Sequence, residues 1–490
     1  MVLRFCVFTL LCVAPTCFTY AVERPNILFC LADDWGWPHA GAYGDRVVAT
    51  PAFDRLAREG VLFDHAYVSS PSCTPCRSSI LTGQQFYRLG EGANLWSTLD
   101  IKHPNFMFLL RDAGYEIGHW RKAWGPGTWT ASGYKEHPAG KEYGQKKGAT
   151  LSGFEVFMKE RNKSKPFCFW FGTSDPHRGY KKGTGQQSGI PVDQVRPPSF
   201  YPNSPEIKND IADYYYEVQR WDSDVSKAIA LLEQKGLLDN TIVVMTGDHG
   251  MPFPRCKGNL YDWGTRVPLA IRWGRNVKVG RTVNSFTSLT DLAPTFLEVV
   301  GLNIPEQMTG RSLVSLMQNP NSENVDPKRS FIVTGRERHT PAQAFPSMSG
   351  YPSRGIRTDK WLLILNHEPQ LWPAGVPQGS THKADQFSDC DGGPTRTFLL
   401  KNKDSRFYDL CFGKRPAVEL YDNRADPDQI NNLAENPEYS KTVNVLRDKL
   451  IAYLKETNDP RQSGEPITFY NFPYRGPRLK QSVKNGSNGK

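Results

Sequence analysis

The sequence lacks the features that would place it outside the folded, globular proteins. It has no internal repeat, and its 42 glycines and 37 prolines follow no period, which excludes a collagen-like or low-complexity chain. The basic residues behind the net charge of +10 are dispersed, apart from a short run in residues 475–490. Dispersed charge of this kind does not indicate nucleic-acid binding, so we predict no nucleic-acid partner. It is compatible with a polyanionic substrate.

Long apolar runs are scarce as well, and the clearest lies at the N-terminus. Residues 5–17 are apolar, follow Arg4, and precede the small residues around Ala21. This pattern predicts a cleaved signal peptide over residues 1–21, with an N-terminal anchor as the alternative. The run is short for a membrane span. We therefore expect a secreted, periplasmic or lysosomal-type protein with no stable membrane span.

The cysteine count is odd once the predicted signal peptide is removed. Seven of the ten cysteines remain: Cys30, Cys73, Cys76, Cys168, Cys256, Cys390 and Cys411. An odd number in an exported protein leaves at least one thiol unpaired or used in chemistry. Cys390 and Cys411 share one loop-rich stretch and are the one candidate disulfide; buried free thiols are the alternative for the rest.

Buried strands alternate with helices over most of the chain. Near-continuous apolar runs predict strands at residues 26–31, 166–171 and 241–245. Apolar residues recur at helical spacing in residues 52–59, 106–113, 211–236 and 289–300. This alternation predicts an α/β fold with a central, mostly parallel sheet flanked by helices.

The pattern changes after about residue 350. Residues 354–364 predict two antiparallel strands joined by a turn, residues 419–422 a further strand and residues 443–457 a helix, whereas residues 368–406 read as a long irregular insertion. We predict a smaller C-terminal α+β domain with an antiparallel sheet. The expected divisions are a signal peptide (1–21), a catalytic domain (22–350), a C-terminal subdomain (351–470) and a basic, disordered tail (471–490).

Polar residues follow each of the three predicted strands. The pairs are Asp33 with Asp34, Asp175 with His177, and Asp248 with His249. Ligands of open α/β sheets bind beyond the carboxyl ends of the strands, so the three clusters can converge on one site. Adjacent carboxylates repel one another unless a cation neutralises them, which favours a hard divalent ion; a solvated loop is the alternative.

Residues 73–83, CTPCRSSILTG, carry the most specific pattern. They resemble the sulfatase signature C-x-P-x-R-x-x-x-L-T-G at every fixed position. The flanks agree: residues 24–28 lead to Asp33 and Asp34, and residues 419–427 contain ELYD and a later Asp-Pro. From about residue 24 to 432 the chain resembles the sulfatases, a branch of the alkaline phosphatase superfamily, which implies an alkaline-phosphatase-like sheet.

This resemblance implies a particular nucleophile. A formylglycine-generating maturation enzyme would oxidise Cys73 to formylglycine, which hydrates to a diol. One diol oxygen would attack sulfur and the other would later expel the sulfate, with Arg77 stabilising the charge.

The metal site is implied in the same way. Asp33, Asp34, Asp248 and His249, with the converted Cys73, match the ligands of one metal ion, usually calcium. Asparagine is common at the place of His249. Nitrogen is a less usual ligand for a hard ion, so a hydrogen bond from His249 to the sulfate or the diol stays an alternative.

Cations should surround the transferred sulfate, because charge accumulates on its oxygens in the transition state. His177 matches the family's sulfate-binding or acid histidine, and Lys257 matches the cation that holds a sulfate oxygen near the leaving group. Asp175 and Arg178 flank His177 and are predicted to bind substrate with it.

One part of the family pattern is missing. Many sulfatases carry a Gly-Lys-Trp-His segment, and Lys122 matches its lysine. The histidine that helps to deprotonate the diol falls on Ala123 or Trp124. Either His119 substitutes for it at the substrate site, or another base is used.

Two stretches, residues 175–178 and 250–254, resemble the heparan N-sulfatases (sulfamidases) within the family. We therefore predict a sulfuric ester or sulfamate hydrolase that acts on a sulfated oligo- or polysaccharide, such as a glycosaminoglycan. A phosphonate or phosphate monoester hydrolase of the same superfamily is the alternative. A non-catalytic glycan-binding relative is disfavoured by the intact nucleophile motif and metal pairs.

Overall fold

The computed structural model describes residues 24–144, 152–319, 326–344, 346–379, 386–464 and 466–477. The predicted signal peptide and residues 478–490 of the predicted tail lie outside them. None of the helices in these ranges combines the length and the apolar character that crossing a membrane requires.

An eight-stranded sheet forms the larger part of the molecule, in the order β5-β4-β6-β1-β7-β8-β2-β9. Its pairs are parallel except those of β8 with β7 and β2. The strands are β1 (Asn26–Ala32), β2 (Val61–Phe63), β4 (Glu116–Trp120), β5 (Lys141–Glu142), β6 (Phe167–Gly172), β7 (Thr241–Gly247), β8 (Leu269–Trp273) and β9 (Arg281–Val283). A separate parallel pair joins β3 (Ala66–Tyr67) to β10 (Thr287–Ser288).

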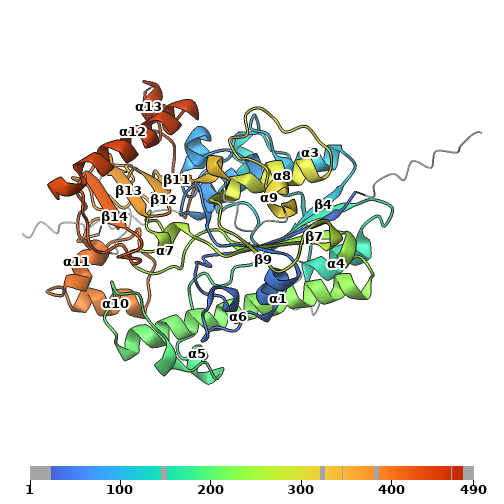
Figure 1. Ribbon diagram of the computed structural model, residues 1–490, viewed down its shortest axis with the longest axis horizontal. Coiled ribbons are helices and arrows are strands. Elements are labelled where there is room, and N and C mark those ends of the chain that lie inside the picture. Colours follow the sequence, from blue (N-terminus) through green and yellow to red (C-terminus); the bar gives the residue numbers. More distant parts are fainter. Residues whose placement is uncertain are drawn as a thin grey trace, which may run out of the picture.

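Helices cover both faces of this sheet (Figure 1). The helices of the chain are α1 (Pro51–Glu59), α2 (Cys73–Thr82), α3 (Phe106–Asp112), α4 (Gly153–Glu160), α5 (Thr184–Gln187), α6 (Pro205–Gln234), α7 (Asp262–Thr265), α8 (Leu292–Val299), α9 (Val314–Gln318), α10 (Pro394–Lys401), α11 (Arg406–Phe412), α12 (Ser440–Glu456) and α13 (Pro460–Ser463). Helices α1, α4 and α6 pack on one face, and α2, α3 and α8 on the other. The mostly parallel α/β fold predicted from the sequence is confirmed.

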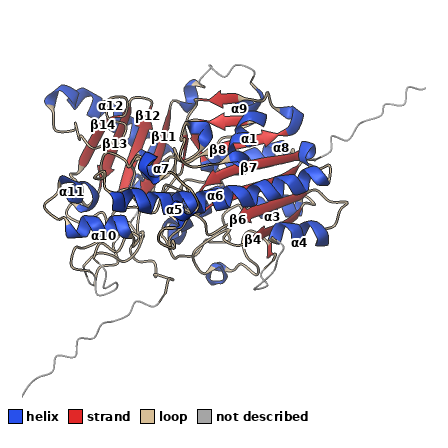
Figure 2. Ribbon diagram, turned by 90° about the horizontal axis from the view of Figure 1, so that it is seen from below, coloured by secondary structure: helices blue, strands red, loops and turns tan. Residues whose placement is uncertain are grey.

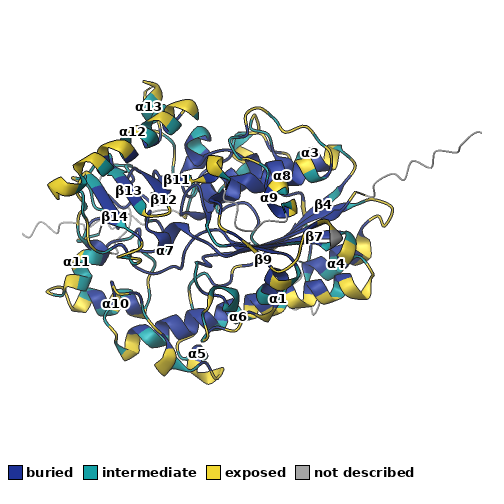
Figure 3. Cartoon of the chain, in the orientation of Figure 1, coloured by how far each residue is buried: buried dark blue, intermediate teal, exposed yellow. Residues whose placement is uncertain are grey.

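Strand β1 shows why its sequence is almost continuously apolar. Successive side chains of a strand point to opposite faces. Leu28 and Cys30 enter the core under α1 and α6, whereas Ile27, Phe29 and Leu31 enter the core under α2, α3 and α8. Neither face meets water, so neither set of positions can be polar. The eight-stranded sheet is correspondingly dark blue, the colour of buried residues, in Figure 3, and exposed residues gather on the outer helices.

A second, four-stranded antiparallel sheet follows in the chain (Figure 2). It consists of β11 (Phe331–Arg336), β12 (Ser353–Thr358), β13 (Trp361–Asn366) and β14 (Val418–Asp422). Helix α12 packs on it through Leu446, Leu450 and Leu454. The predicted C-terminal antiparallel sheet is thus confirmed, and β11 adds a strand that precedes the predicted division at residue 350.

The insertion at residues 368–406 differs from the sequence-based expectation. It was predicted to be irregular, yet its second half forms α10 and leads into α11. The candidate disulfide is also wrong, because Cys390 and Cys411 are free thiols. Their sulfur atoms have different neighbours: the carbonyl oxygen of Asp391 at 3.6 Å for Cys390, and that of Phe200 at 3.8 Å for Cys411.

The described part of the predicted tail is anchored to the rest of the molecule. Arg475 forms an ion pair with Glu91 at 2.5 Å. The guanidinium of Arg338 donates to the carbonyl oxygens of Phe472 and Pro473. These contacts fix residues 472–475, where the sequence predicted disorder.

Candidate active site

Three neighbouring strand ends bring the predicted polar clusters together. Strand β1 lies between β6 and β7, and Ala32 pairs with Gly247 in the last register position. Asp33 and Asp248, the next residues of the two strands, therefore emerge side by side. The backbone N–H of Asp34 donates to Asp248 Oδ1 at 2.9 Å, and that of Asp33 donates to the carbonyl oxygen of Asp175 at 3.0 Å.

Helix α2 begins at Cys73, and all ten of its residues are buried. Its first turn carries the positive end of the helix dipole, which favours negative charge at Cys73. The helix ends at Gly83, whose φ of +63° is in the left-handed region and where an added Cβ would lie 2.7 Å from Met308 Sδ. The final glycine of the CTPCRSSILTG motif is therefore required by the backbone and by packing.

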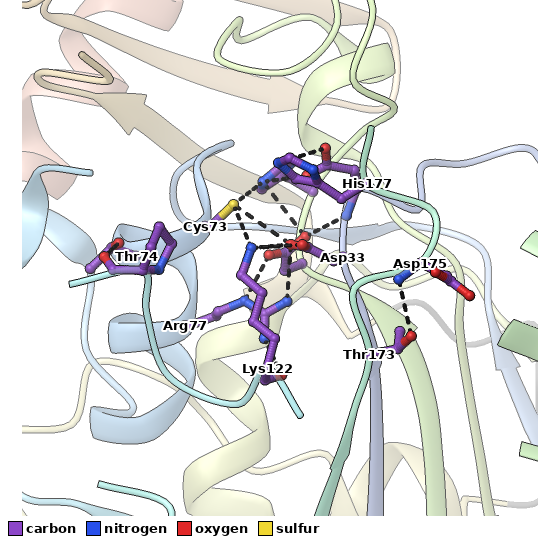
Figure 4. A network of polar contacts seen from close by, with 12 residues as sticks. Asp33, Cys73, Thr74, Arg77, Lys122, Thr173, Asp175 and His177 are labelled. Carbon is purple, nitrogen blue, oxygen red and sulfur yellow. Dashed lines mark hydrogen bonds and ion pairs between the residues drawn. The ribbon is translucent and has the colours of Figure 1, made fainter. Parts of the chain in front are cut away.

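The Cys73 sulfur lies close to Lys122 and Asp33 (Figure 4). Sγ is 3.3 Å from His249 Nε2, 3.3 Å from Lys122 Nζ and 3.7 Å from Asp33 Oδ1. Lys122 also bonds both oxygens of Asp33, at 2.5 and 2.7 Å. We call Asp33, Asp34, Cys73, Arg77, Asp248 and His249 the floor of the site.

Arg77 ties the floor together from below. Its Nε donates to Asp248 Oδ2 at 2.8 Å and its Nη2 to Asp33 Oδ1 at 3.3 Å. Its Nη1 donates to the backbone carbonyl oxygens of Lys122 and Ala123 at 2.9 and 2.6 Å. The guanidinium thus links two strand ends, helix α2 and the loop that carries Lys122.

Burial and charge oppose each other in this cluster. Burial alone would raise the pKa of Asp33, but Lys122 and Arg77 outweigh it and hold that pKa well below its usual range. Burial likewise opposes the effect of His249 and Arg77 on Asp248, whose pKa is lowered overall. Burial favours neutral Lys122, yet Asp33 raises its pKa. The carboxylates and the ammonium group are charged at neutral pH.

The floor fits a hard divalent cation. Asp34, Cys73 and His249 can each place a ligand atom within 4.8 Å of the others, and so can Asp33, Cys73 and Asp248. Asp34 Oδ1 is buried and accepts no hydrogen bond, although His249 Nε2 lies 3.3 Å away, and such an oxygen is costly unless another group satisfies it. Carboxylate oxygens are the ligands that calcium prefers.

Above the floor, a second group of side chains, His177, Lys257 and Asp391, forms what we call the wall. Lys257 Nζ lies 2.8 Å from Asp34 Oδ2 and 3.1 Å from Asp391 Oδ2. Burial disfavours its charge, but Asp34 and Asp391 raise the pKa of Lys257 well above its usual value. His177 Nε2 is 3.9 Å from Asp34 Oδ2. The two predicted sulfate-binding cations therefore flank the same carboxylate.

The structure brings Lys122, but not His119, to Cys73, the predicted nucleophile. The imidazole of His119 stacks on that of His137, with ring centroids 4.1 Å apart, and bonds the carbonyl oxygen of Gly140. Trp124, which stands near the place of the family histidine, donates from Nε1 to Ser78 Oγ. Within the described residues, the imidazole in contact with the Cys73 thiol is that of His249.

Arg178, predicted to bind substrate, is held by protein groups. Its guanidinium forms a two-pronged ion pair with Asp210, both bonds 2.8 Å long, and its Nε donates to the carbonyl oxygen of Pro252. This arrangement leaves Arg178 a structural role. Asp175 supports Asp33 through its backbone, while its carboxylate lies 3.3 Å from Arg220.

Sequence reasoning missed Asp391 and His339. His339 Nδ1 lies 2.8 Å from the hydroxyl of Ser72, the residue before Cys73. Asp391 lies in the insertion that was expected to be irregular. Neither residue follows a predicted strand or belongs to a signature, so no local signal marked them.

Comparisons with known proteins agree with this geometry. A family model described as Sulfatase matches residues 25–302, and one described as N-sulphoglucosamine sulphohydrolase, C-terminal, matches residues 247–372. The chain is 30% identical to N-sulphoglucosamine sulphohydrolase of Homo sapiens, over 89% of this chain and 91% of that protein. It is 27% identical to an ulvan-active sulfatase of Formosa agariphila, over 89% and 81%.

Solved structures share the fold. A protein in complex with D-glucosamine-2-N,6-O-disulfate superposes with a TM-score of 0.62 at 20% identity, over 89% of this chain and 99% of that chain. The phosphonate monoester hydrolase of Agrobacterium radiobacter has a TM-score of 0.62 at 17% identity, over 89% and 96%. The fold therefore does not choose between sulfate and phosphonate chemistry. The sulfatase model covers more than half of the chain and the human relative spans most of it, so this protein belongs to the sulfatase family and is a hydrolase of that family.

Proposed function

We propose that this sulfatase removes sulfate from a sulfated carbohydrate, with Cys73 converted to formylglycine as the nucleophile and one calcium ion in the floor. One observation carries the proposal. Cys73 is the first residue of a buried helix and lies against Lys122, His249 and Asp33, between the ends of β1 and β7. A nucleophile, a cation and a metal-binding set thus meet at one point.

The unmodified thiol is poorly suited to attack sulfur itself. Burial raises the pKa of Cys73 far above its usual value, and Lys122 and Lys257 offset this only in part. The thiol therefore stays protonated at neutral pH, whereas reactive cysteines have lowered pKa values. A thiol that stays protonated supports a chemical role for Cys73 only after conversion by a formylglycine-generating enzyme.

Each charged side chain has a role that follows from its position. Lys122 is protonated and lies 3.3 Å from the Cys73 sulfur, so it can stabilise negative charge on the nucleophile or donate a proton there. Arg77 keeps Asp33 and Asp248 in place through its hydrogen bonds. Calcium, when bound, would be held by Asp33, Asp34, Asp248 and His249 and would act as a Lewis acid there.

Lys257 and His177 supply the contacts for the sulfate. Both lie within 4 Å of Asp34. Positive charge fixed in advance beside the transferred oxygens stabilises the transition state more than the ground state. His177 is partly exposed and can protonate a leaving group.

The substrate class rests on the relatives and on charge. One relative is named for N-sulphoglucosamine and another for ulvan, and both names denote sulfated carbohydrates. A net charge of +10 favours the approach of a polyanion. A glycosaminoglycan or a similar polysaccharide, met in a secreted, periplasmic or lysosomal-type compartment, fits both observations.

A desulfation screen tests the proposal. Protein whose Cys73 conversion has been verified by mass is offered defined heparan and algal oligosaccharides, and a phosphonate monoester in parallel. Release of sulfate from a sugar is expected, with a higher kcat/KM than for the phosphonate. Faster phosphonate turnover would favour the alternative hydrolase. Tight binding of a sulfated glycan without any turnover would favour the non-catalytic relative.

The metal can be tested without activity. Calcium at 100 times its Kd should stabilise the protein by about 2.7 kcal/mol, measured as a rise in melting temperature after treatment with a chelator. The Asp34→Asn variant should lose most of this rise. An equal rise in both proteins would contradict a calcium site in the floor.

A further inference from the structure

Asp391 places a carboxylate in the wall beside the sulfate-binding cations. Its Oδ2 is buried and lies 3.1 Å from Lys257 Nζ, while 29% of its side chain stays exposed. Burial would raise the pKa of Asp391, but Lys257, His177 and His339 outweigh it and lower that pKa. The group is therefore negatively charged beside Lys257 and His177, where the proposed substrate would bring a second negative charge. A charge that opposes sulfate binding needs a different partner.

The insertion that carries Asp391 is fastened to the catalytic domain. Asp210 of α6 accepts both prongs of Arg178 and also hydrogen bonds from the backbone and hydroxyl of Thr395. An added Cβ at Gly393 would lie 2.4 Å from Arg178 Nη1, so the insertion packs directly on this ion pair. Two residues before Asp391, Asp389 accepts hydrogen bonds from Thr340 and Arg336. Asp391 is held in place from both sides.

O-sulfated sugars (sulfate esters) and N-sulfated sugars (sulfamates) differ in the charge of the group that hydrolysis releases. Hydrolysis of a sulfate ester breaks the S–O bond and releases a neutral alcohol. Hydrolysis of a sulfamate, R–NH–SO₃⁻ + H₂O → R–NH₃⁺ + SO₄²⁻, breaks the S–N bond, and the nitrogen takes up both protons of water in all. Positive charge therefore develops on a leaving amine but not on a leaving alcohol. A carboxylate close to the leaving group stabilises the first and not the second.

We propose that Asp391 is a specificity-determining residue that contacts the nitrogen of an N-sulfated amino sugar and favours cleavage of its S–N bond over an S–O bond. The inference rests on the proposed function and adds the class of bond. Lys257 joins the two parts of the site, because its ammonium contacts both Asp34 in the floor and Asp391 in the wall. The sulfate held there brings its bridging nitrogen to the side of Asp391.

The test compares two substrates in one variant. Asp391→Asn keeps the shape of the side chain and removes the charge. The kcat/KM for glucosamine N-sulfate is expected to fall about tenfold or more, the size of a lost charge-assisted hydrogen bond, and that for 4-nitrophenyl sulfate less than about threefold. A merely structural role would lower both alike. Asp391→Glu, which keeps the charge, should retain most of the preference for the sulfamate.

Asp404→Asn is the matched control, since it removes the same charge from an exposed position of the same insertion. It should leave both values unchanged. An equal loss on both substrates in Asp391→Asn, or wild-type protein that cleaves the ester but not the sulfamate, overturns the role of Asp391 alone. Wild-type protein that cleaves neither substrate, nor any in the screen above, contradicts the proposed function instead.

Discussion

The floor and the wall of the site are built in different ways. The floor comes from two strand ends, β1 and β7, and from the first turns of α2, and its side chains are at most 2% exposed. The wall comes from the loops after β6 and β7 and from an insertion of the C-terminal domain. His177 and Asp391 are 34% and 29% exposed there. The floor is part of the core, whereas two of the three side chains of the wall reach solvent and the third, Lys257, is only 5% exposed.

This difference suggests that the floor serves the reaction itself and the wall serves the choice of substrate. The backbone of the floor is fixed by the hydrogen bonds of a buried sheet, so its groups hold one geometry. The wall depends on loops, which vary more readily and usually carry specificity. Changes in the floor should therefore affect both stability and every substrate, whereas changes in the wall should affect turnover and the choice of substrate.

The largest effect is expected at Cys73. Cys73→Ala removes the nucleophile and should lower sulfate release at least about 10⁴-fold on every substrate. The control is Cys168→Ala, which truncates another buried thiol, one that contacts Met107 at 3.5 Å. It should keep its activity once folded. Full turnover by Cys73→Ala would overturn the whole mechanism.

Arg77→Ala tests whether the floor is also part of the core. The change leaves Asp33 and Asp248 buried without their shared cation, which should lower the free energy of unfolding by about 3–5 kcal/mol in urea denaturation. Arg111→Ala removes exposed ion pairs and should cost no more than about 1 kcal/mol. Similar losses in the two variants would break the distinction drawn for the floor.

His177→Ala tests whether a change in the wall lowers activity without lowering stability. It should lower kcat/KM by about 10²–10³-fold, the effect of losing one group that stabilises the transition state. The free energy of unfolding should change by less than about 1 kcal/mol, because the side chain is one-third exposed. Lys182→Ala, in the exposed loop that follows, serves as the control. A variant that unfolds would place His177 with the floor.

His119 belongs to neither the floor nor the wall. Its effect should appear in how the free energy of unfolding depends on pH. Burial lowers the pKa of His119 to about 3, against about 6.5 in the unfolded chain. Below pH 6.5 the unfolded state therefore binds more protons than the folded state. The folded state has its full stability above that pH and loses stability as the pH falls. Between pH 7 and pH 5, the free energy of unfolding of His119→Gln should fall by about 2 kcal/mol less than that of the wild type, measured by urea denaturation. An unchanged pH dependence, or loss of turnover at neutral pH in the folded variant, would contradict this assignment.

The sequence predicted that the floor residues would meet, because each of them lies next to a local signal, whereas their roles stay predictions. Asp33 and Asp248 directly follow buried strands, and Cys73 and Arg77 belong to one short motif. Parallel neighbouring strands end at one edge of the sheet, so these residues had to meet there. The role suggested for His119 failed for a related reason, since it lies inside β4, where its ring points to His137.

The wall could not be predicted in this way. Asp391 lies 134 positions after Lys257, and Arg178 meets the insertion through its ion pair with Asp210 and its contact with Gly393. Contacts of this kind depend on how the second sheet and its insertion pack on the first, and no pattern of apolar residues or short motif specifies that packing.

The sequence by itself thus determined the family and the α/β fold and predicted Cys73 as the nucleophile, because periodicity and a signature are local properties of a chain. Only the tertiary structure decided which charges surround Asp34, that Arg178 supports an insertion, and that Asp391 shares Lys257 with Asp34. The physical reason is that Coulomb energy and burial depend on distance in space, which residues far apart in sequence acquire only when the two domains pack together.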